Sequence, residues 1–208
     1  MTTPTATSAA TSGAGPPVDG RTARRDRNRD AVLDAVIELF TEGQVGLAAA
    51  DVAARSGVSL RSVYRYFDDL DALARAAIAR QMERFAPLAE LCDPGIGSLK
   101  DRIDRTVSGR MRLYEAIGPT RRAALQRAPA NPIIAEQLER TRALLQAQVE
   151  AMFAPELGAL PAAERRDLAA AIDVLLGFEA FDHLRRSRGM TPAETRRVVD
   201  SALTRLLA

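Results

Sequence analysis

The side chains with the clearest chemical potential lie close together, between residues 59 and 67 of the 208-residue chain. This segment reads Ser-Leu-Arg-Ser-Val-Tyr-Arg-Tyr-Phe, so it combines hydroxyl, guanidinium and phenol groups and contains no acidic residue. Guanidinium groups pair with guanine edges, and hydroxyl groups reach phosphate oxygens. The composition therefore favours a surface that contacts DNA over a catalytic site.

The residues around this segment predict two short helices joined by a tight turn. Gly57 supplies the left-handed residue that ends the first helix, and Ser59 is a good N-cap for a second helix that starts at about Leu60. Val63 and Phe67 are four residues apart and should point inward. The remaining side chains then occupy the outer and flanking faces, which is the pattern of a helix-turn-helix whose second helix enters the major groove.

With these residues the chain resembles the TetR family of one-component transcriptional repressors. The resemblance covers residues 25–85, with the motif at 48–67 preceded by an apolar helix at 31–40. It rests on Val52-Ala53, Ser56-Gly57-Val58-Ser59 and Ser62-Val63-Tyr64-Arg65-Tyr66-Phe67. The family usually has Thr at the position of Ala48, where it caps a helix and touches phosphate, and Lys at the position of Leu70. The resemblance therefore implies fewer phosphate contacts from this motif than is usual.

The resemblance implies an all-α fold of about nine helices. A three-helix DNA-binding domain should be followed by a larger helical domain for effector binding and dimerisation. We expect a disordered tail at 1–20, a basic arm and helix-turn-helix at 21–67, and the second domain at 68–208. The first helix should run from about Arg24 to Thr41, before Gly43 and Gly46.

Residues 21–29 contain five arginines and one acid, Asp26. A basic arm in this place can follow a phosphate row or a minor groove, although a charge run alone is more often a solvated tail. We expect Arg61, Ser62 and Leu60 to meet base edges. The predicted DNA-contacting positions are Arg24, Arg25, Ala48, Ser59, Leu60, Arg61, Ser62, Tyr64, Arg65 and Tyr66.

The helices of the second domain follow from apolar spacing and from Gly and Pro residues. Asp68 should cap a helix over 69–91, which the segment 92–98 ends. Further helices are predicted at 99–117, where Gly118-Pro119 ends the first, then at 120–127, 131–154 and 162–188, and after a capping box at Thr191. Cys92 is expected to be a small core residue, with a redox sensor as the alternative.

The last two predicted helices have broad apolar faces, which suggests that each meets two partners. In the TetR family these helices form a four-helix bundle between subunits, so we expect a homodimer that binds a near-palindromic operator. The alternative is that both helices complete a monomeric core.

The resemblance also implies a cavity for a small molecule among the helices from 69 to 188. Polar residues beside apolar faces, together with the apolar Phe178, are its candidate lining: Arg110, Tyr114, Gln146, Phe178, Glu179, Asp182 and His183. The effector should be largely hydrophobic, and cationic if Glu179 faces inward. Each candidate has an ordinary alternative, since His183 suits a surface and Glu179 or Asp182 could pair with arginines such as Arg185.

Other classes of protein fit less well. One histidine, one cysteine and no metal-ligand spacing leave little equipment for catalysis, so we expect neither an enzyme nor a metal or cofactor site. Neither a signal peptide nor a membrane span is recognisable, which predicts a cytoplasmic protein. A helical adaptor, a TetR-like activator and a regulator without an effector stay open as alternatives.

Overall fold

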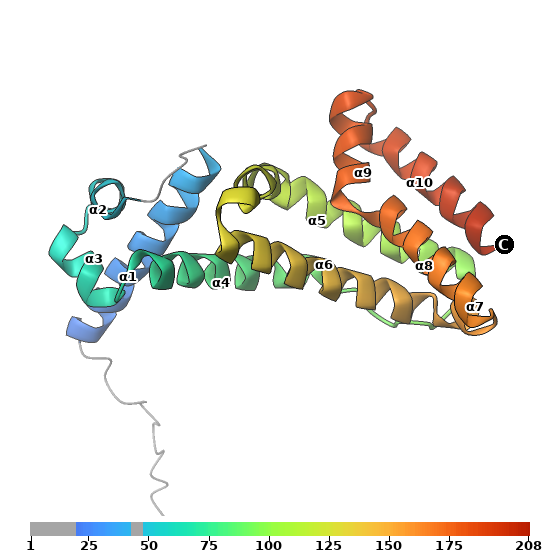
Figure 1. Cartoon of the computed structure of the whole chain (residues 1–208), viewed down its shortest axis with the longest axis horizontal. Coiled ribbons are helices and arrows are strands. Elements are labelled where there is room, and N and C mark those ends of the chain that lie inside the picture. The colour runs from blue at the N-terminus through green and yellow to red at the C-terminus, as the bar shows by residue number, and fades with distance from the viewer. Residues whose placement is uncertain (1–19, 43–47) are drawn as a thin grey trace, which may run out of the picture.

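The computed structural model describes residues 20–42 and 48–208, which form helices joined by short turns and contain no strand. The ten α-helices, against about nine predicted, are α1 Gly20–Thr41, α2 Ala49–Ser56, α3 Leu60–Tyr66, α4 Leu70–Ala89, α5 Leu99–Arg127, α6 Pro132–Met152, α7 Ala154–Gly158, α8 Ala162–Leu176, α9 Phe178–Asp182 and α10 Pro192–Leu207. Helices α1 to α3 form a small module at one end, and α4 runs from it along the larger helical body (Figure 1). The all-α expectation is confirmed.

The small module has a core of its own. Apolar side chains of α1 pack against Val52 of α2, Val63 of α3 and Leu73 of α4. Val32 and Val52 are completely buried, and Val63 and Leu73 almost so. The inward orientation of Val63 and Phe67 is confirmed, and the start of α4 completes this core.

Helix α1 begins earlier than predicted, at Gly20 rather than at about Arg24. The arginines at 21–29 therefore lie on its first turns and do not form an extended arm. No Gly or Pro interrupts residues 21–41, and Ala and Arg favour the helix. The rest of the expected tail and the glycines Gly43 and Gly46 lie outside the described residues.

The helix starts follow the predicted caps with one exception. The side chain of Ser59 accepts a hydrogen bond from the Ser62 amide, and that of Asn131 accepts bonds from two amides of α6. Thr191 and Glu194 form the predicted capping box. The cap of α4 is Asp69, which accepts from the Ala72 amide at 2.6 Å, so the assignment of Asp68 was wrong by one residue.

The predicted break at Gly118-Pro119 is wrong, because α5 continues through both residues to Arg127. A proline inside a helix removes one backbone hydrogen bond and costs about 3 kcal/mol. Buried side chains on both sides of it, including Tyr114 before and Ala123 after, hold the helix together. Tertiary packing outweighs the local preference here.

The helix predicted over 162–188 is interrupted at Gly177, whose φ of −71° and ψ of 154° are extended. The remainder forms α9 and a π-helical turn, His183–Ser187. The carbonyl of Leu176, which lies next to the break, accepts a hydrogen bond from the Tyr114 hydroxyl at 2.8 Å. A side chain of α5 thus satisfies a backbone group at the break.

Arg102 joins the N-terminal end of α5 to the end of α6 and to α7. Its guanidinium donates to the Met152 carbonyl at 2.9 Å and to both carboxylate oxygens of Glu156. The Arg102 side chain is 5% exposed and that of Glu156 is 20% exposed. The pair closes one end of a second core that contains Ile172 and Leu203.

Cys92 is exposed in the turn between α4 and α5, so its assignment to the core was wrong. The turn contains left-handed residues at Asp93, Gly95 and Gly97, and such a turn keeps its side chains near solvent. Within residues 20–42 and 48–208 no helix is long and apolar enough to cross a membrane.

Candidate nucleic-acid interface and effector pocket

Helices α2 and α3 form a helix-turn-helix, with the turn at Gly57 and Val58. Gly57 has a φ of 68°, the left-handed conformation that a glycine adopts without strain. Val58 is buried in the core of the small module, which anchors the turn. Because Val63 and Phe67 are buried behind it, α3 is held with one fixed face outward.

The outer face of α3 carries four exposed side chains at positions i, i+1, i+4 and i+5: Leu60, Arg61, Tyr64 and Arg65. Leu60 is 43% exposed and Tyr64 is 53% exposed, although both are large and largely apolar. Ser62 and Tyr66 are half-buried on the flanks. The face is about two helical turns long and includes no acidic side chain. Such a face can enter the major groove between two rows of phosphates.

The polar groups of α3 differ in how far they are already engaged. The Ser62 hydroxyl accepts from Ser59 Oγ at 3.0 Å, and Arg65 Nη2 lies 3.3 Å from the Tyr66 hydroxyl to which it donates. This hydrogen bond is the main cause that lowers the pKa of Tyr66. Arg61 and Tyr64, in contrast, make no hydrogen bond to any residue the structure describes, so their polar groups are available to a partner.

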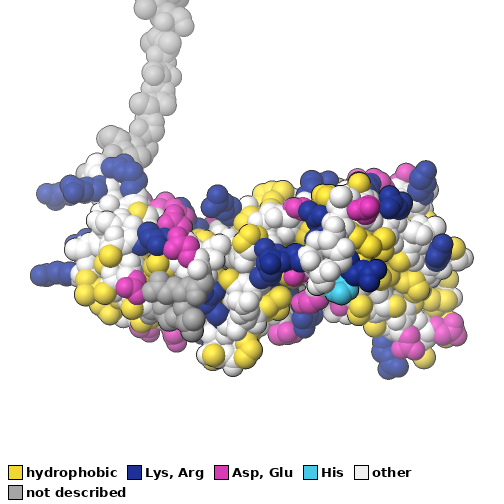
Figure 2. Space-filling view, turned by 90° about the horizontal axis from the view of Figure 1, so that it is seen from above, with side chains coloured by type: hydrophobic (Ala, Val, Ile, Leu, Met, Phe, Trp, Pro, Cys, Tyr) yellow, Lys and Arg dark blue, Asp and Glu magenta, His cyan; other side chains and the backbone are white. Residues whose placement is uncertain are grey.

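The arginines of α1 extend this surface. Arg29 lies over the Phe67 ring at 5.3 Å, and Arg25 is close enough to influence the Tyr66 hydroxyl. Arg24, Arg25 and Arg27 are exposed, and dark blue side chains project from this end of the molecule in Figure 2. Cations at the start of a helix oppose its dipole, and the first turn of α1 holds no acid to compensate. An external anion would compensate for this charge.

The two departures from the family pattern have visible consequences. Ala48 occupies the N-cap position of α2, and no side-chain hydrogen bond caps the helix. Leu70 is half-buried against the core of the small module and cannot reach a phosphate. Ala48 is exposed, so the position itself is accessible.

Two sets of ion pairs fix the orientation of the module. Arg55 of α2 bonds Glu42 at 2.7 Å, just after α1. Arg80 of α4 bonds Asp30 and Asp34 of α1, each at 2.9 Å. Through α1, the position of α3 therefore depends on the position of α4.

A second candidate site is a wide pocket of about 500 Å³ between α5, α6, α8 and α9. It brings together five of the seven residues predicted to meet an effector: Arg110, Tyr114, Phe178, Glu179 and His183. Gln146 lines a neighbouring pocket instead. Asp182 pairs with Arg122 at 2.9 Å and does not line the wide pocket.

Two buried polar side chains shape the wide pocket. The Tyr114 hydroxyl, bonded to the Leu176 carbonyl, has its pKa raised to about 12 by burial. Its ring meets the Phe178 ring edge-on, with 5.5 Å between the centroids. Arg110 donates to Gln148 at 3.0 Å and to the Leu145 carbonyl at 2.8 Å, and burial lowers its pKa. Both groups hold neighbouring helices in place.

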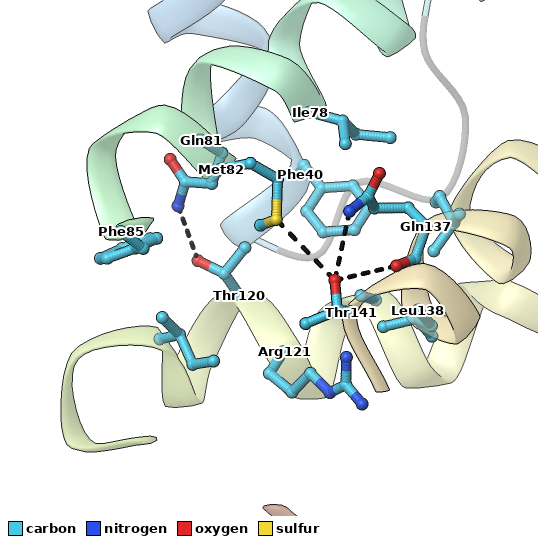
Figure 3. A pocket seen from close by; sticks show the side chains of 13 residues that line it. Phe40, Ile78, Gln81, Met82, Phe85, Thr120, Arg121, Gln137, Leu138 and Thr141 are labelled. Carbon is cyan, nitrogen blue, oxygen red and sulfur yellow. Dashed lines mark hydrogen bonds between the residues drawn. The ribbon is translucent and has the colours of Figure 1, made fainter. Parts of the chain in front are cut away.

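A narrow pocket of about 100 Å³ adjoins the wide one, and Figure 3 shows its lining. Its walls come from α4, α5 and α6, and Phe40 of α1 closes one side. Ile117, Arg121 and Thr141 line both pockets. Among the described residues, no group of His, Cys, Asp and Glu side chains could hold a metal ion.

Sequence reasoning missed Phe40 and Arg121 as pocket residues. Arg121 follows Arg110, Tyr114 and Ile117 at i+11, i+7 and i+4, so all four lie on one face of α5. This spacing was visible in the sequence, but the predicted break at Gly118-Pro119 separated Arg121 from the others.

No protein-family model matches the sequence, and no curated protein matches it. Solved structures do match the fold. A TetR-family transcriptional regulator from Streptomyces coelicolor shares 18% identity, with a TM-score of 0.67, over 87% of this chain and 80% of its own. A transcriptional regulator from Rhodococcus sp. Rha1 shares 21% identity, with a TM-score of 0.62, over 88% of this chain and 95% of its own. The multidrug binding protein EbrR, complexed with imidazole, shares 21% identity, with a TM-score of 0.54, over 87% of this chain and 95% of its own. The chain therefore has the fold of TetR-family transcriptional regulators.

Proposed function

We propose that this chain is a DNA-binding transcriptional regulator that binds a palindromic operator as a homodimer and is released by a small molecule. The observation that carries the proposal is the outer face of α3, on which Arg61 and Tyr64 are exposed, unengaged and free of nearby acids on the same helix. The fold shared with TetR-family regulators supports it.

The contacts divide into two kinds. Arg61, with Leu60 and Ser62 beside it, reads base edges in the major groove. Ser59, Tyr64 and Tyr66, the amide end of α2 at Ala48, and the α1 arginines Arg24 and Arg25 hold phosphates. Arg65, which lies over the Tyr66 ring, neutralises negative charge on the DNA backbone.

The dimer is formed by α8 and α10. Val174 of α8 is 70% exposed, and Val198 and Leu206 of α10 are 38% and 40% exposed. Hydrophobic side chains are visible at the end of the molecule that these helices occupy (Figures 1 and 2). Covering them with the same helices of a second chain gives a two-fold interface, and the two α3 helices then face two half-sites.

The release step uses the wide and narrow pockets. A small molecule shifts the protein only if it binds the DNA-incompetent arrangement more tightly. Phe40 lies on α1, so occupation of the narrow pocket bears directly on the helix that positions α3. EbrR, which has the same fold, is described as a multidrug binding protein, and this supports a small-molecule role for the helical body.

The test of the DNA interface is the double variant Arg61→Ala with Tyr64→Ala. Its affinity for operator DNA, measured by fluorescence anisotropy, should fall at least tenfold, because a base contact and a phosphate contact are both lost. The matched control is Arg84→Ala, which removes one exposed cation from α4 and should leave affinity within a factor of two. Equal, salt-dependent binding by the double variant and the wild type would instead favour a helical adaptor.

A further inference from the structure

Arg121 is the one arginine lining the two pockets that is buried without a bonded partner. It is 9% exposed, and its Nε is buried without a hydrogen-bond partner. No ion pair within 4.0 Å and no hydrogen bond to its guanidinium is found among the residues that the structure describes, and Figure 3 shows it beside the narrow pocket without such a bond. Removal from water lowers its pKa.

The other arginines of the wide pocket are engaged. Arg110 is bonded to Gln148 and to the Leu145 carbonyl. Arg142 lies 3.1 Å from Glu139 and 3.8 Å from Glu179, which places the carboxylate of Glu179 with Arg142 at the rim. Arg121 therefore has no bonded partner where the two pockets meet, and Glu179 acts on its charge only from beyond ion-pair distance.

A buried cation without a partner is costly, and an anion that binds beside it recovers that cost. From this we infer that the effector of the proposed regulator is an amphipathic organic acid, whose acidic group binds Arg121 and whose apolar body occupies the narrow pocket beside Phe40. The planar guanidinium can donate two parallel hydrogen bonds to one carboxylate.

The narrow pocket suits the apolar part of such a molecule. Its walls include Ile78, Met82, Phe85 and Leu138, with Phe40 at the side of the DNA-binding module. Two polar groups near it are bonded to neighbours: Thr141 donates to the Gln137 carbonyl at 2.9 Å, and Gln81 donates to Thr120 at 3.5 Å. The Gln81 Oε1 atom is buried without a hydrogen-bond partner. The condition for a cationic effector, a Glu179 carboxylate that faces inward, is not met, because Glu179 is 56% exposed and lies 3.8 Å from Arg142.

The test compares three probes with the same chain length: octanoate, octan-1-ol and octylamine. Binding is measured by isothermal titration calorimetry with the full-length protein and no DNA. We expect octanoate to bind the wild type at least tenfold more tightly than the alcohol, because a charge-assisted hydrogen bond is stronger than a neutral one. Octylamine should bind more weakly still. Shortening to hexanoate should weaken binding about fourfold for each methylene group removed from the apolar pocket.

Two variants at position 121 and one control complete the test. Arg121→Met should reduce octanoate binding to the level of octanol, and Arg121→Lys should retain a preference for the acid. Without ligand, Arg121→Met should unfold at a temperature equal to or higher than the wild type, because the unpaired cation is gone. Arg112→Gln, at an exposed position of α5 outside both pockets, should leave octanoate binding unchanged. Equal binding of the acid and the alcohol by the wild type, or octanoate binding that survives in Arg121→Met, would overturn the inference.

This inference rests on the proposed function only in calling the bound acid an effector. Experiments can therefore contradict the acid site and the regulator function independently of each other. If octanoate binds through Arg121 but the protein binds no DNA, the acid site is supported and the proposed regulator function is contradicted. Operator binding by a protein that ignores octanoate would do the reverse.

Discussion

Arg61 and Arg121 show how one residue type acquires two roles from its surroundings. Arg61 is exposed on α3, so water satisfies its guanidinium until DNA replaces the water. Arg121 is buried between two pockets, where water cannot fully satisfy it. The first was recognisable from the sequence, because it belongs to a local motif. The second was not, because its lack of a partner depends on residues from α4, α6 and α9.

Ala48 leads to a prediction about both stability and affinity. The change Ala48→Thr should stabilise the protein by about 1 kcal/mol, because a Thr side chain at the N-cap of α2 can accept from a free amide that Ala48 leaves unbonded. The hydroxyl should also tighten DNA binding by adding a phosphate contact. Urea unfolding and anisotropy titration measure the two effects. Ala48→Val, which has a similar shape and no hydroxyl, should give neither gain.

At the scale of elements, local sequence rules predicted helix ends correctly where a capping side chain or a proline marks them. They failed where contacts between helices determine whether a helix continues. The cap at Ser59, the start of α6 at Asn131-Pro132 and the Thr191 box are local hydrogen-bond patterns, and all are present. The continuation of α5 through Pro119 and the break at Gly177 depend on side chains from other helices. Sequence spacing alone contains no record of those contacts.

The Arg102–Glu156 pair gives a prediction about pH. The hydrogen bonds that Glu156 accepts from Arg102 lower the pKa of Glu156 in the folded state. The lowered pKa means a contribution to stability that is complete above the unfolded pKa of about 4.3 and is lost as the pH falls through the folded value. Glu156→Gln should cost about 3 kcal/mol at pH 7, since it leaves Arg102 largely buried and without its counter-ion.

The measurement is the free energy of unfolding in urea between pH 3 and pH 7, with Glu164→Gln of exposed helix α8 as the control. The loss caused by Glu156→Gln should shrink toward the acid end, because the wild-type carboxylate is protonated there. An equal loss at every pH would contradict the assigned role of the pair.

At the scale of the whole molecule, the exposed apolar side chains of α8 and α10 predict the assembly. The pair of changes Val198→Glu with Leu206→Glu should convert the protein into a species of 22.4 kDa in sedimentation, half the mass of the expected dimer. Charged groups cannot be buried across an interface without large cost. Leu144→Glu on α6, at a side chain that is 56% exposed, should leave the dimer intact. A wild-type protein that sediments only as a monomer would rule out the dimer.

The arrangement of two α3 helices on one two-fold axis is the central claim, and selection from random DNA duplexes tests it most directly. The purified protein should enrich duplexes that contain an inverted repeat, with half-sites about one helical turn, or 34–36 Å, apart. Binding should weaken steeply as salt rises, and the enriched sites should be lost with Arg61→Ala and Tyr64→Ala. Enrichment of no sequence, or of a single unrepeated site that the double variant binds equally well, would contradict the account.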